Sequence, residues 1–281
     1  MGKEPSIGAK DGVTLVNKPL VTVLIPAYNR ATYVAKAIES VQRQTLENFL
    51  CIVIDDGSTD ETRLLIESYA ADDSRIRCLA LPENRGLGQA LDAGLREVTT
   101  PFFTILDSDD WYAPRTLEVC LHAIEQAPLD VSLVCGNAVV WEEHPDGRLI
   151  EKERQPGRAF SNQYDFILYG PTLVPRFLRT KTVLSVGGFE RDPITDGRMA
   201  EDRLLLLKLI HVSNFIYVDE DLYHIRVHKD NMTKPQTREK FVEVKRYIFT
   251  RMLKEWGDEY EAEFYIHPEG WLDIRSLIPK K

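Results

Sequence analysis

The chain has 281 residues, of which 43% are hydrophobic and 28% charged, and its formal net charge is −9. These values describe an ordinary soluble protein that is long enough to bury a full hydrophobic core. The negative charge argues against a nucleic-acid partner, and no stretch is long and apolar enough to predict a transmembrane segment.

The first half of the sequence alternates between apolar runs and amphipathic stretches. Short apolar runs predict buried strands, and apolar residues spaced three or four apart predict helices. Pro26 is expected to end the first strand, and Ser58 with Glu61 has the spacing of a capping box for the second helix. This alternation predicts a parallel, doubly wound sheet with right-handed crossovers. The predicted strands are residues 20–25, 49–54, 76–81 and 102–106, and the predicted helices are residues 33–44, from the capping box to about 70, and 86–98.

The second half of the sequence is less regular. Pro145-Asp146-Gly147 predicts a turn inside a polar stretch at residues 142–163, and Gly187-Gly188 predicts a break. A second unit begins with residues 172–178, and the chain ends in an acidic, aromatic tail. We expect helices at residues 114–126, near Thr182, at 200–212 and at 236–255, and strands at 131–141 and 215–218.

The N-terminal segment and the cysteines indicate a compartment. Residues 1–18 are polar, lack the apolar centre of a signal peptide and are expected to form a flexible tail. The four cysteines stand singly in apolar surroundings without the spacing of a metal site, which is typical of reduced cysteines in a cytosolic protein. They are Cys51, Cys78, Cys120 and Cys135.

Three carboxylates, Asp107, Asp109 and Asp110, follow the predicted strand at residues 102–106. Ligands of open α/β sheets bind at the carboxyl ends of the strands. Clustered carboxylates repel one another unless a cation compensates them, and their oxygens suit Mg²⁺, Mn²⁺ or Ca²⁺. The alternative is that they cap the following helix, in whose first turn Pro114 fits, but a cap requires only one acid.

Three loops are expected at the same edge of the sheet, because the carboxyl ends of parallel strands meet there. They are residues 26–30, 55–60 and 107–110. Asp55 and Asp56 can accept hydrogen bonds from a ribose or a base. Alternatively, they belong to a glycine-containing turn whose acids favour the next helix.

Taken together, the segments Val21–Arg30, Ile54–Asp60 and Leu106–Asp110 resemble the opening motifs of family 2 glycosyltransferases. The resemblance covers roughly residues 20–235 and implies the α/β GT-A fold, a Rossmann-like, mainly parallel sheet flanked by helices, here with a C-terminal helical extension. Asp92 departs from the family pattern, in which Asn is usual. Further matches before the acidic strand are Asn84, Gly86, Ala90 and Gly94.

The resemblance also implies a donor site for a nucleotide diphosphate sugar, with UDP expected from its frequency in the family. Asp107 and Asp109 match the family's Asp-x-Asp motif, in which Asp109 would bind Mn²⁺ or Mg²⁺ directly and Asp107 would lie nearer the ribose or a metal-bound water. For Arg85 a surface position is an equal alternative. The implied donor-binding residues are Pro26, Ala27, Tyr28, Asn29, Arg30, Asp56, Arg85, Asp107 and Ser108.

The catalytic base implied by the resemblance is Asp202, in the pair Glu201-Asp202 at a predicted helix start. An inverting transfer needs a carboxylate near the acceptor hydroxyl, and Glu201 would support it. From the sequence alone, two acids that favour a helix N-terminus would be the simpler explanation.

Further contacts are implied on the metal and sugar sides. His228, within the segment Tyr223–Asn231, is a candidate metal ligand, although loop histidines are commonly surface or hydrogen-bonded residues. Arg226 and Lys229 are candidate diphosphate contacts, with solvated surface charges as the alternative. Trp111 is expected either to form the floor of the sugar pocket or to pack in the core.

These interpretations divide the chain into a tail at residues 1–18, a nucleotide-sugar-binding part at 19–135, an acceptor-binding catalytic part at 136–235, and a C-terminal helix and tail at 236–281. The expected protein is a cytoplasmic, metal-dependent, inverting glycosyltransferase for polysaccharide biosynthesis, with a saccharide or glycoconjugate acceptor. The basic final helix is expected to pack on the catalytic part or a homodimer partner; contact with the inner face of a membrane is its alternative.

Two other functions remain open from the sequence. One is a metal-dependent phosphohydrolase, which would need a nucleophilic Asp after the first strand, where this chain has Pro26-Ala27-Tyr28-Asn29. The other is an inactive sugar-nucleotide-binding protein, against which the intact acids Asp107, Asp109 and Asp202 argue.

Overall fold

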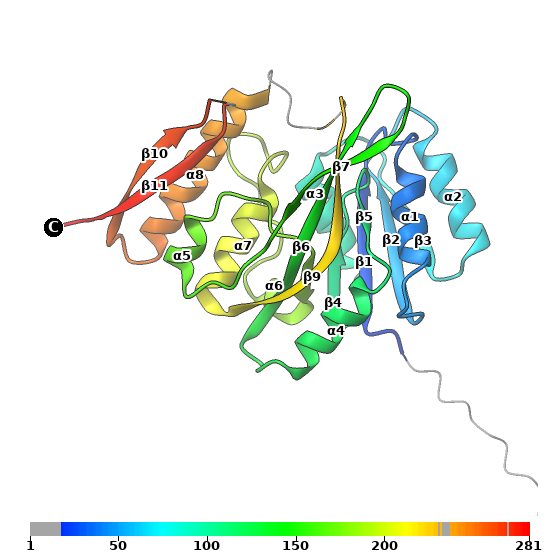
Figure 1. Cartoon of the computed structure of the whole chain (residues 1–281), viewed down its shortest axis with the longest axis horizontal. Coiled ribbons are helices and arrows are strands. Elements are labelled where there is room, and N and C mark those ends of the chain that lie inside the picture. The colour runs from blue at the N-terminus through cyan, green and yellow to red at the C-terminus, as the bar shows by residue number, and fades with distance from the viewer. Residues whose placement is uncertain (1–17, 230, 232–236, 269) are drawn as a thin grey trace, which may run out of the picture.

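The computed structural model describes residues 18–229, 231, 237–268 and 270–281. A nine-stranded sheet lies between helices on both faces, and a two-stranded hairpin follows at the C-terminus (Figure 1). The helices are α1 Val34–Gln42, α2 Thr62–Asp72, α3 Leu87–Arg96, α4 Thr116–Gln126, α5 Gln163–Ile167, α6 Thr180–Ser185, α7 Glu201–Val212 and α8 Arg238–Glu255. The strands are β1 Val21–Ala27, β2 Phe49–Asp55, β3 Ile76–Ala80, β4 Phe102–Ile105, β5 Trp111–Tyr112, β6 Val131–Glu143, β7 Leu149–Gln155, β8 Arg176–Arg179, β9 Asn214–Val227, β10 Tyr260–Ile266 and β11 Leu272–Pro279.

The sheet has the strand order β3-β2-β1-β4-β8-β6-β9-β5, and β7 pairs with β6. The first four strands are parallel, as predicted. β8 is antiparallel to both β4 and β6, while β6 and β9 are parallel. The prediction of an α/β sheet flanked by helices is confirmed, and the purely parallel arrangement ends at β4. The carboxyl ends of β1, β2 and β4 therefore share one edge.

Two local predictions about this edge are wrong. β1 continues through Pro26 to Ala27 instead of ending before Pro26. A proline has no N–H group to donate to a neighbouring strand. Pro26 is tolerated because the pairing of β1 with β4 ends at Leu24, so that only β2 is paired with β1 at Pro26. The capping box is also absent, since the Oδ1 atom of Asp60 accepts the Thr62 N–H at the start of α2 and the Ser58 hydroxyl accepts the Asn29 N–H instead.

The C-terminal extension contains more than the predicted helix. α8 packs against the β10–β11 hairpin and α7, on the side of the molecule opposite α2 and β3 in Figure 1. Its buried face, which includes Val244, Ile248 and Phe249, agrees with the expected packing on the part at residues 136–235, to which α7 belongs. Residue 236, the predicted helix start, lies outside the described residues, as do residues 1–17. No described helix combines the length and apolarity that a membrane span requires.

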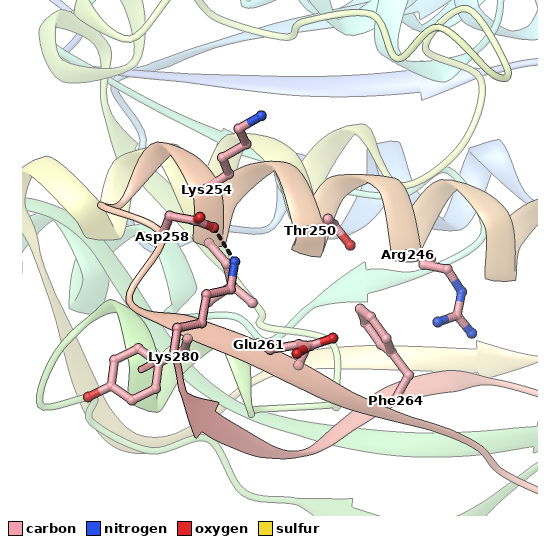
Figure 2. A pocket seen from close by; sticks show the side chains of 10 residues that line it. Arg246, Thr250, Lys254, Asp258, Glu261, Phe264 and Lys280 are labelled. Carbon is pink, nitrogen blue, oxygen red and sulfur yellow. Dashed lines mark hydrogen bonds and ion pairs between the residues drawn. The ribbon is translucent and has the colours of Figure 1, made fainter.

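A cavity of about 700 Å³ lies between α8 and the hairpin (Figure 2). Arg246, Lys254 and Lys280 line it together with Asp258 and Glu261, and Lys280 forms an ion pair with Asp258. None of the strand-end acids lines this cavity. It is therefore separate from the edge on which the chemistry-bearing side chains converge.

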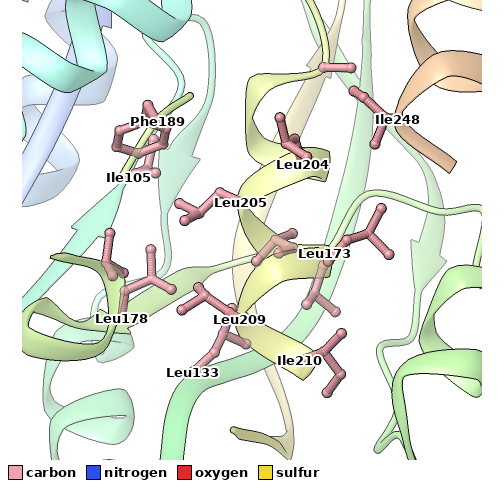
Figure 3. Packing of buried hydrophobic residues seen from close by; sticks show 14 of the residues in the cluster. Ile105, Leu133, Leu173, Leu178, Phe189, Leu204, Leu205, Leu209, Ile210 and Ile248 are labelled. Carbon is pink, nitrogen blue, oxygen red and sulfur yellow. The ribbon is translucent and has the colours of Figure 1, made fainter. Parts of the chain in front are cut away.

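The core is divided by the sheet into two layers. Along β1, Val23 and Ile25 face one layer, with α1 and α4, while Leu24 faces the other, with α3 and α7. This alternation is the period of two expected for a strand. Figure 3 shows the second layer, in which Leu205 and Leu209 of α7 and neighbouring residues pack between the sheet and α8. Hydrophobic packing on both faces of the sheet therefore holds β1, β2 and β4 in place.

Candidate active site

The end of β1 opens into a cavity of about 390 Å³. Of the predicted donor-binding residues, six line it: Pro26, Ala27, Tyr28, Arg30, Asp56 and Ser108. Its mixture of apolar surface and a few polar groups is typical of a small-molecule site. Residues that the sequence analysis had not assigned to the donor site complete it, and these are Asn84, Gly86, Leu87, Ala90, Arg198, Met199 and Asn231.

Asp56 fixes the loop that forms one wall of this donor cavity. Its buried carboxylate accepts the backbone N–H groups of Arg85 and Gly86, each at 2.8 Å, and the side-chain amide of Asn84 at 3.0 Å. Burial raises the pKa of Asp56, although the backbone N–H groups act against this rise. The Arg85 side chain is exposed and does not line the cavity, so the structure places its backbone, and not its guanidinium, beside Asp56.

Asn29 also shapes the edge without lining the cavity. It adopts a positive φ of 51°, and its side-chain oxygen accepts the Thr59 N–H at 2.8 Å. Asn is one of the residues that tolerate this left-handed conformation best. Together with the bond from the Asn29 N–H to Ser58, this contact ties the β1 and β2 loops to each other.

A second cavity of about 300 Å³ adjoins the first and shares Pro26, Arg30 and Ser108 with it. The acids from distant parts of the chain meet in this reaction cavity. It is lined by Asp107, Asp109, Asp110, Glu201 and Asp202.

A buried arginine joins the predicted donor acid to the predicted base. The guanidinium of Arg176 donates from Nη2 to both carboxylate oxygens of Asp107, at 3.0 and 2.9 Å, and from Nη1 to Asp202 at 2.6 Å. Its Nε has no partner in the described structure. Burial raises the pKa of Asp107, the positive charge of Arg176 opposes that rise, and the charges of Asp109 and Asp202 add to it. Arg176 thus holds two negative charges side by side.

Asp109 points toward a different set of partners. Its Oδ2 lies 3.1 Å from the Nε2 of His228 and 3.6 Å from the Nε of Arg30. Burial would raise the pKa of Asp109, but the hydrogen bond with His228 and the charge of Arg30 lower it below its usual value. The His228 ring also contacts Tyr33, with centroids 4.2 Å apart. The structure therefore brings the predicted metal ligands Asp109 and His228 together.

The fit of this pair to a metal rests on its donor chemistry. A carboxylate oxygen and an imidazole nitrogen suit Mn²⁺, and Mg²⁺ sites commonly use one or two carboxylates with substrate phosphates. Within the described ranges, no three His, Cys, Asp or Glu side chains form a preformed metal cluster. Asp107 is engaged by Arg176. The site suits a metal that takes its remaining ligands from the donor.

Asp110 and Trp111 turn away from the donor cavity. The buried carboxyl of Asp110 accepts the backbone N–H of Arg226 at 2.8 Å, and burial raises its pKa well above the usual value. Trp111 lines neither cavity; its ring stacks on His224 with centroids 5.1 Å apart and lies under the Lys36 ammonium. In this structure the tryptophan belongs to a packed aromatic cluster.

The two predicted diphosphate contacts of the late segment differ in position. Arg226 is buried, lines the reaction cavity and lies 3.5 Å from Glu143. Lys229 is exposed and lines neither the donor nor the reaction cavity. Asp230 lies outside the described residues.

Glu201 and Asp202 begin α7, as predicted, directly after Ala200, whose φ of 55° is unusual for a residue with a side chain. Glu201 is buried, and burial together with the charge of Asp202 raises the pKa of Glu201 to about 8. Asp202 has an accessible side chain, 27% exposed, and its Oδ1 accepts the Arg203 N–H. The two acids thus differ: Glu201 is enclosed, and Asp202 faces the cavity.

Replacement of Glu201 by Gln is expected to flatten the pH dependence of stability. Between about pH 4.5 and 8 the folded carboxyl keeps a proton that the unfolded chain has lost, so the wild-type free energy of unfolding falls as pH rises. Gln cannot titrate, and the variant should gain about 3 kcal/mol relative to wild type from pH 5 to pH 8. Urea unfolding at both pH values measures this, with exposed Glu47→Gln as control. If the free energy of unfolding of wild type and of Glu201→Gln changed equally with pH, the raised pKa of Glu201 would be contradicted.

Sequence reasoning missed Arg176 and Arg198. Arg176 carried a signal, since it is a charged residue within the otherwise apolar run 173–178. Such a residue needs a buried counter-charge. Arg198 donates to the Asn84 side chain at 2.7 Å, across 114 residues of sequence, and no local pattern indicates that pairing.

Comparison with known proteins decides the family. The sequence model described as Glycosyl transferase family 2 matches residues 22–183, more than half of the chain. The chain belongs to glycosyl transferase family 2. The matched region contains the three strand-end loops and Arg176, while Asp202, His228 and the whole C-terminal extension of this glycosyltransferase lie beyond it.

Chondroitin synthase from Escherichia coli is 29% identical over 229 residues, which make up 79% of this chain and 31% of that protein. This glycosyltransferase therefore corresponds to about a third of that relative. TarS 1–349 from S. aureus, solved in complex with UDP-GlcNAc, has a TM-score of 0.62 at 21% identity and covers 83% of this chain and 66% of that one. Mannosyltransferase PcManGT from Pyrobaculum calidifontis, in complex with GDP-Man and Mn²⁺, has a TM-score of 0.61 at 18% identity, covering 85% and 65%. These likenesses show the GT-A fold.

Proposed function

We propose that this enzyme transfers a sugar from a nucleotide diphosphate donor, first of all a UDP-sugar, to a hydroxyl of a saccharide or glycoconjugate, with inversion and with a divalent metal. One observation carries the proposal: the donor cavity adjoins a reaction cavity in which Asp107, Asp109 and Asp202 face the same space. The UDP-GlcNAc complex of TarS supports UDP, and the GDP-Man and Mn²⁺ complex of PcManGT supports a metal.

On the donor side, the nucleotide would occupy the cavity beside Pro26, Tyr28 and Asp56, with its diphosphate toward Asp109 and His228. A bound Mn²⁺ or Mg²⁺ would neutralise charge that develops on the departing diphosphate. Arg30, which lies 3.6 Å from Asp109, adds a positive charge beside the same point. Asp109 and His228 are the residues that would hold the metal.

On the acceptor side, Asp202 would take the proton of the attacking hydroxyl. Arg176 supplies a counter-charge to its carboxylate at 2.6 Å, and the first N–H groups of α7 also favour an anion there. The hydroxyl oxygen would then bond to the anomeric carbon as the bond to the diphosphate breaks on the opposite face. A single displacement of this kind inverts the anomeric centre.

Two wider proposals follow from the same chemistry. We propose the division into a donor part at residues 19–135 and an acceptor part at 136–235 as a division of function and not of separately folded domains. β6 crosses the boundary between the two parts as one continuous strand. A cytoplasmic location, at the inner membrane face when the acceptor is lipid-linked, is supported by the four free cysteines. The phosphohydrolase alternative lacks a nucleophilic Asp at the end of β1.

A donor screen tests the proposed function. Purified enzyme is incubated with UDP-, GDP- and dTDP-sugars, with Mn²⁺, with Mg²⁺ or with excess EDTA, and nucleotide release is measured. One donor should be preferred, and EDTA should reduce its turnover by about 10³-fold or more, since a metal contributes several kcal/mol to stabilising a phosphate leaving group. Release of phosphate from p-nitrophenyl phosphate, without any donor turnover, would instead support a phosphohydrolase.

A further inference from the structure

The C-terminal extension encloses a cavity of about 500 Å³ that adjoins the reaction cavity. The two cavities share Thr172, Ala200, Asp202 and Phe241. The far wall comes from α8 and the β10–β11 hairpin, which lie outside the residues matched by the family. A molecule in this extension cavity would therefore reach Asp202 without entering the donor cavity.

Aromatic side chains form one wall of the extension cavity. Phe241 of α8 and Trp271, which precedes β11, meet edge to face with ring centroids 5.7 Å apart and an interplanar angle of 83°. Both side chains are only partly buried, although they line the cavity. The Arg238 guanidinium lies over the Trp271 ring, 5.8 Å from its centroid. Partly exposed aromatic rings that line a polar cavity are suited to the C–H face of a sugar ring, which packs on them without losing its hydroxyl contacts.

Polar groups on the hairpin face the same space. The Asp273 carboxylate lies 3.2 Å from the Lys245 ammonium and 2.9 Å from the Nε2 of His267. The same Nε2 atom of His267 also lies 2.8 Å from the Tyr265 hydroxyl, so both contacts act on one ring nitrogen. A carboxylate and an imidazole held in this way can accept from and donate to vicinal hydroxyl groups.

The charges of the lining favour a neutral occupant. Lys245 donates to Asp273 and to the Leu272 carbonyl, and Arg203 donates to the carbonyl oxygens of Ile167 and Tyr169. The carboxylates of Asp202 and Asp273 balance the charges of Arg203 and Lys245 in this lining, so an additional carboxylate or phosphate would meet no net positive charge. Ionised ligands need paired charges when they leave water, and hydroxyl groups do not.

We propose that the extension cavity is the acceptor subsite of this enzyme and binds a neutral terminal sugar, which stacks on Trp271 and directs one hydroxyl toward Asp202. This inference rests on the proposed function and adds the acceptor class. In the transfer, the hydroxyl proton passes to Asp202, the oxygen bonds to the anomeric carbon, and the diphosphate leaves with the electron pair of its broken C–O bond. The hairpin is then the element that selects the acceptor.

Binding of p-nitrophenyl β-glycosides to the full chain, in the presence of UDP, tests the subsite without requiring turnover. Glucoside, galactoside and N-acetylglucosaminide serve as neutral probes and the glucuronide as an anionic one, with affinities measured by saturation-transfer NMR. At least one neutral probe should bind, and Trp271→Ala should weaken it about tenfold. Asp273→Asn should also weaken it, and Trp271→Phe should recover most of the affinity. Ile278→Ala, an exposed position of β11, is the matched control.

Three results would overturn the subsite: no neutral glycoside binds wild type, only the glucuronide binds, or Trp271→Ala and Asp273→Asn bind as tightly as Ile278→Ala. Melting temperatures show whether each variant is folded. With an active donor, Trp271→Ala should raise the acceptor KM about tenfold and lower transfer relative to donor hydrolysis. Binding that depends on Trp271 without turnover of any donor would refute the transferase function and leave the saccharide site standing.

Discussion

Asp202→Asn is expected to lower sugar transfer by about 10³-fold, the range that loss of a positioned general base produces. The amide is nearly isosteric with the carboxylate, but it is not a base. It also cannot satisfy both present contacts, because the guanidinium of Arg176 and the backbone N–H of Arg203 are both donors and an amide offers only one oxygen. Steady-state transfer assays at saturating donor measure the change in kcat.

Donor affinity separates a catalytic from a structural effect of this substitution. Asp202 lines the reaction cavity and the extension cavity but not the donor cavity. UDP affinity should therefore remain within about threefold of wild type, while kcat falls by the factor given above. Unchanged binding with a lower kcat is expected when an interaction made only in the transition state is lost. Asp72→Asn, an exposed acid at the end of α2, is the control. Transfer that persists in Asp202→Asn would remove Asp202 from the base role.

β1, β2 and β4 were predictable because each is a short apolar run that is buried on both faces. β3, at the edge of the sheet, was predictable although it is only partly buried. β9 was not, and its prediction as residues 215–218 is too short by ten residues. The strand continues through Asp219 and Asp221, which lie at the surface, where Arg154 of β7 pairs with both. The apolar run that marks the strand in the sequence ends at these acids. The hydrogen-bonded pairing of β9 with β6 continues beyond them.

The C-terminal hairpin was not predicted, although the sequence of β11 contains a pattern that indicates a strand. Leu272 and Ile274 are buried and Asp273 between them faces the extension cavity, which is the two-residue alternation of a half-buried strand. The prediction of an acidic, aromatic tail rested on the composition of this segment and not on the spacing of its apolar residues. β7 was missed for a related reason, since its exposed, charged residues are paired with β6 along one edge only.

In the site, the place of Asp202 was implied by the family resemblance. Sequence order predicted only that the loops after β1, β2 and β4 meet, because the ends of parallel strands converge on one edge. It could not predict which partner each acid has. Arg176 joins Asp107 to Asp202 across 69 and 26 residues, and that pairing depends on the antiparallel placement of β8 beside β4. The orientation of Trp111, which follows the motif directly, likewise depends on its pairing with β9.

Asp109→Ala is expected to raise the Mn²⁺ concentration needed for half-maximal turnover and to lower kcat/KM by about 10³-fold. Removal of this carboxylate leaves His228 as the other candidate ligand and takes the nearest negative charge from Arg30. The buried aspartates beside it cannot substitute, because Asp107 is held by Arg176 and Asp110 accepts the Arg226 N–H. One imidazole and the diphosphate would then have to hold the cation.

Mn²⁺ binding in the presence of UDP gives a readout that does not depend on turnover. Electron paramagnetic resonance of free Mn²⁺ should show at least about tenfold weaker binding for Asp109→Ala and a smaller loss for His228→Ala, because a carboxylate contributes a formal charge that a neutral imidazole lacks. Asp72→Ala removes an exposed acid from α2 and should bind Mn²⁺ as wild type does. If Asp109→Ala keeps its Mn²⁺ affinity while Asp107→Ala loses it, the metal belongs on Asp107, and the ion pair with Arg176 must open when the donor binds.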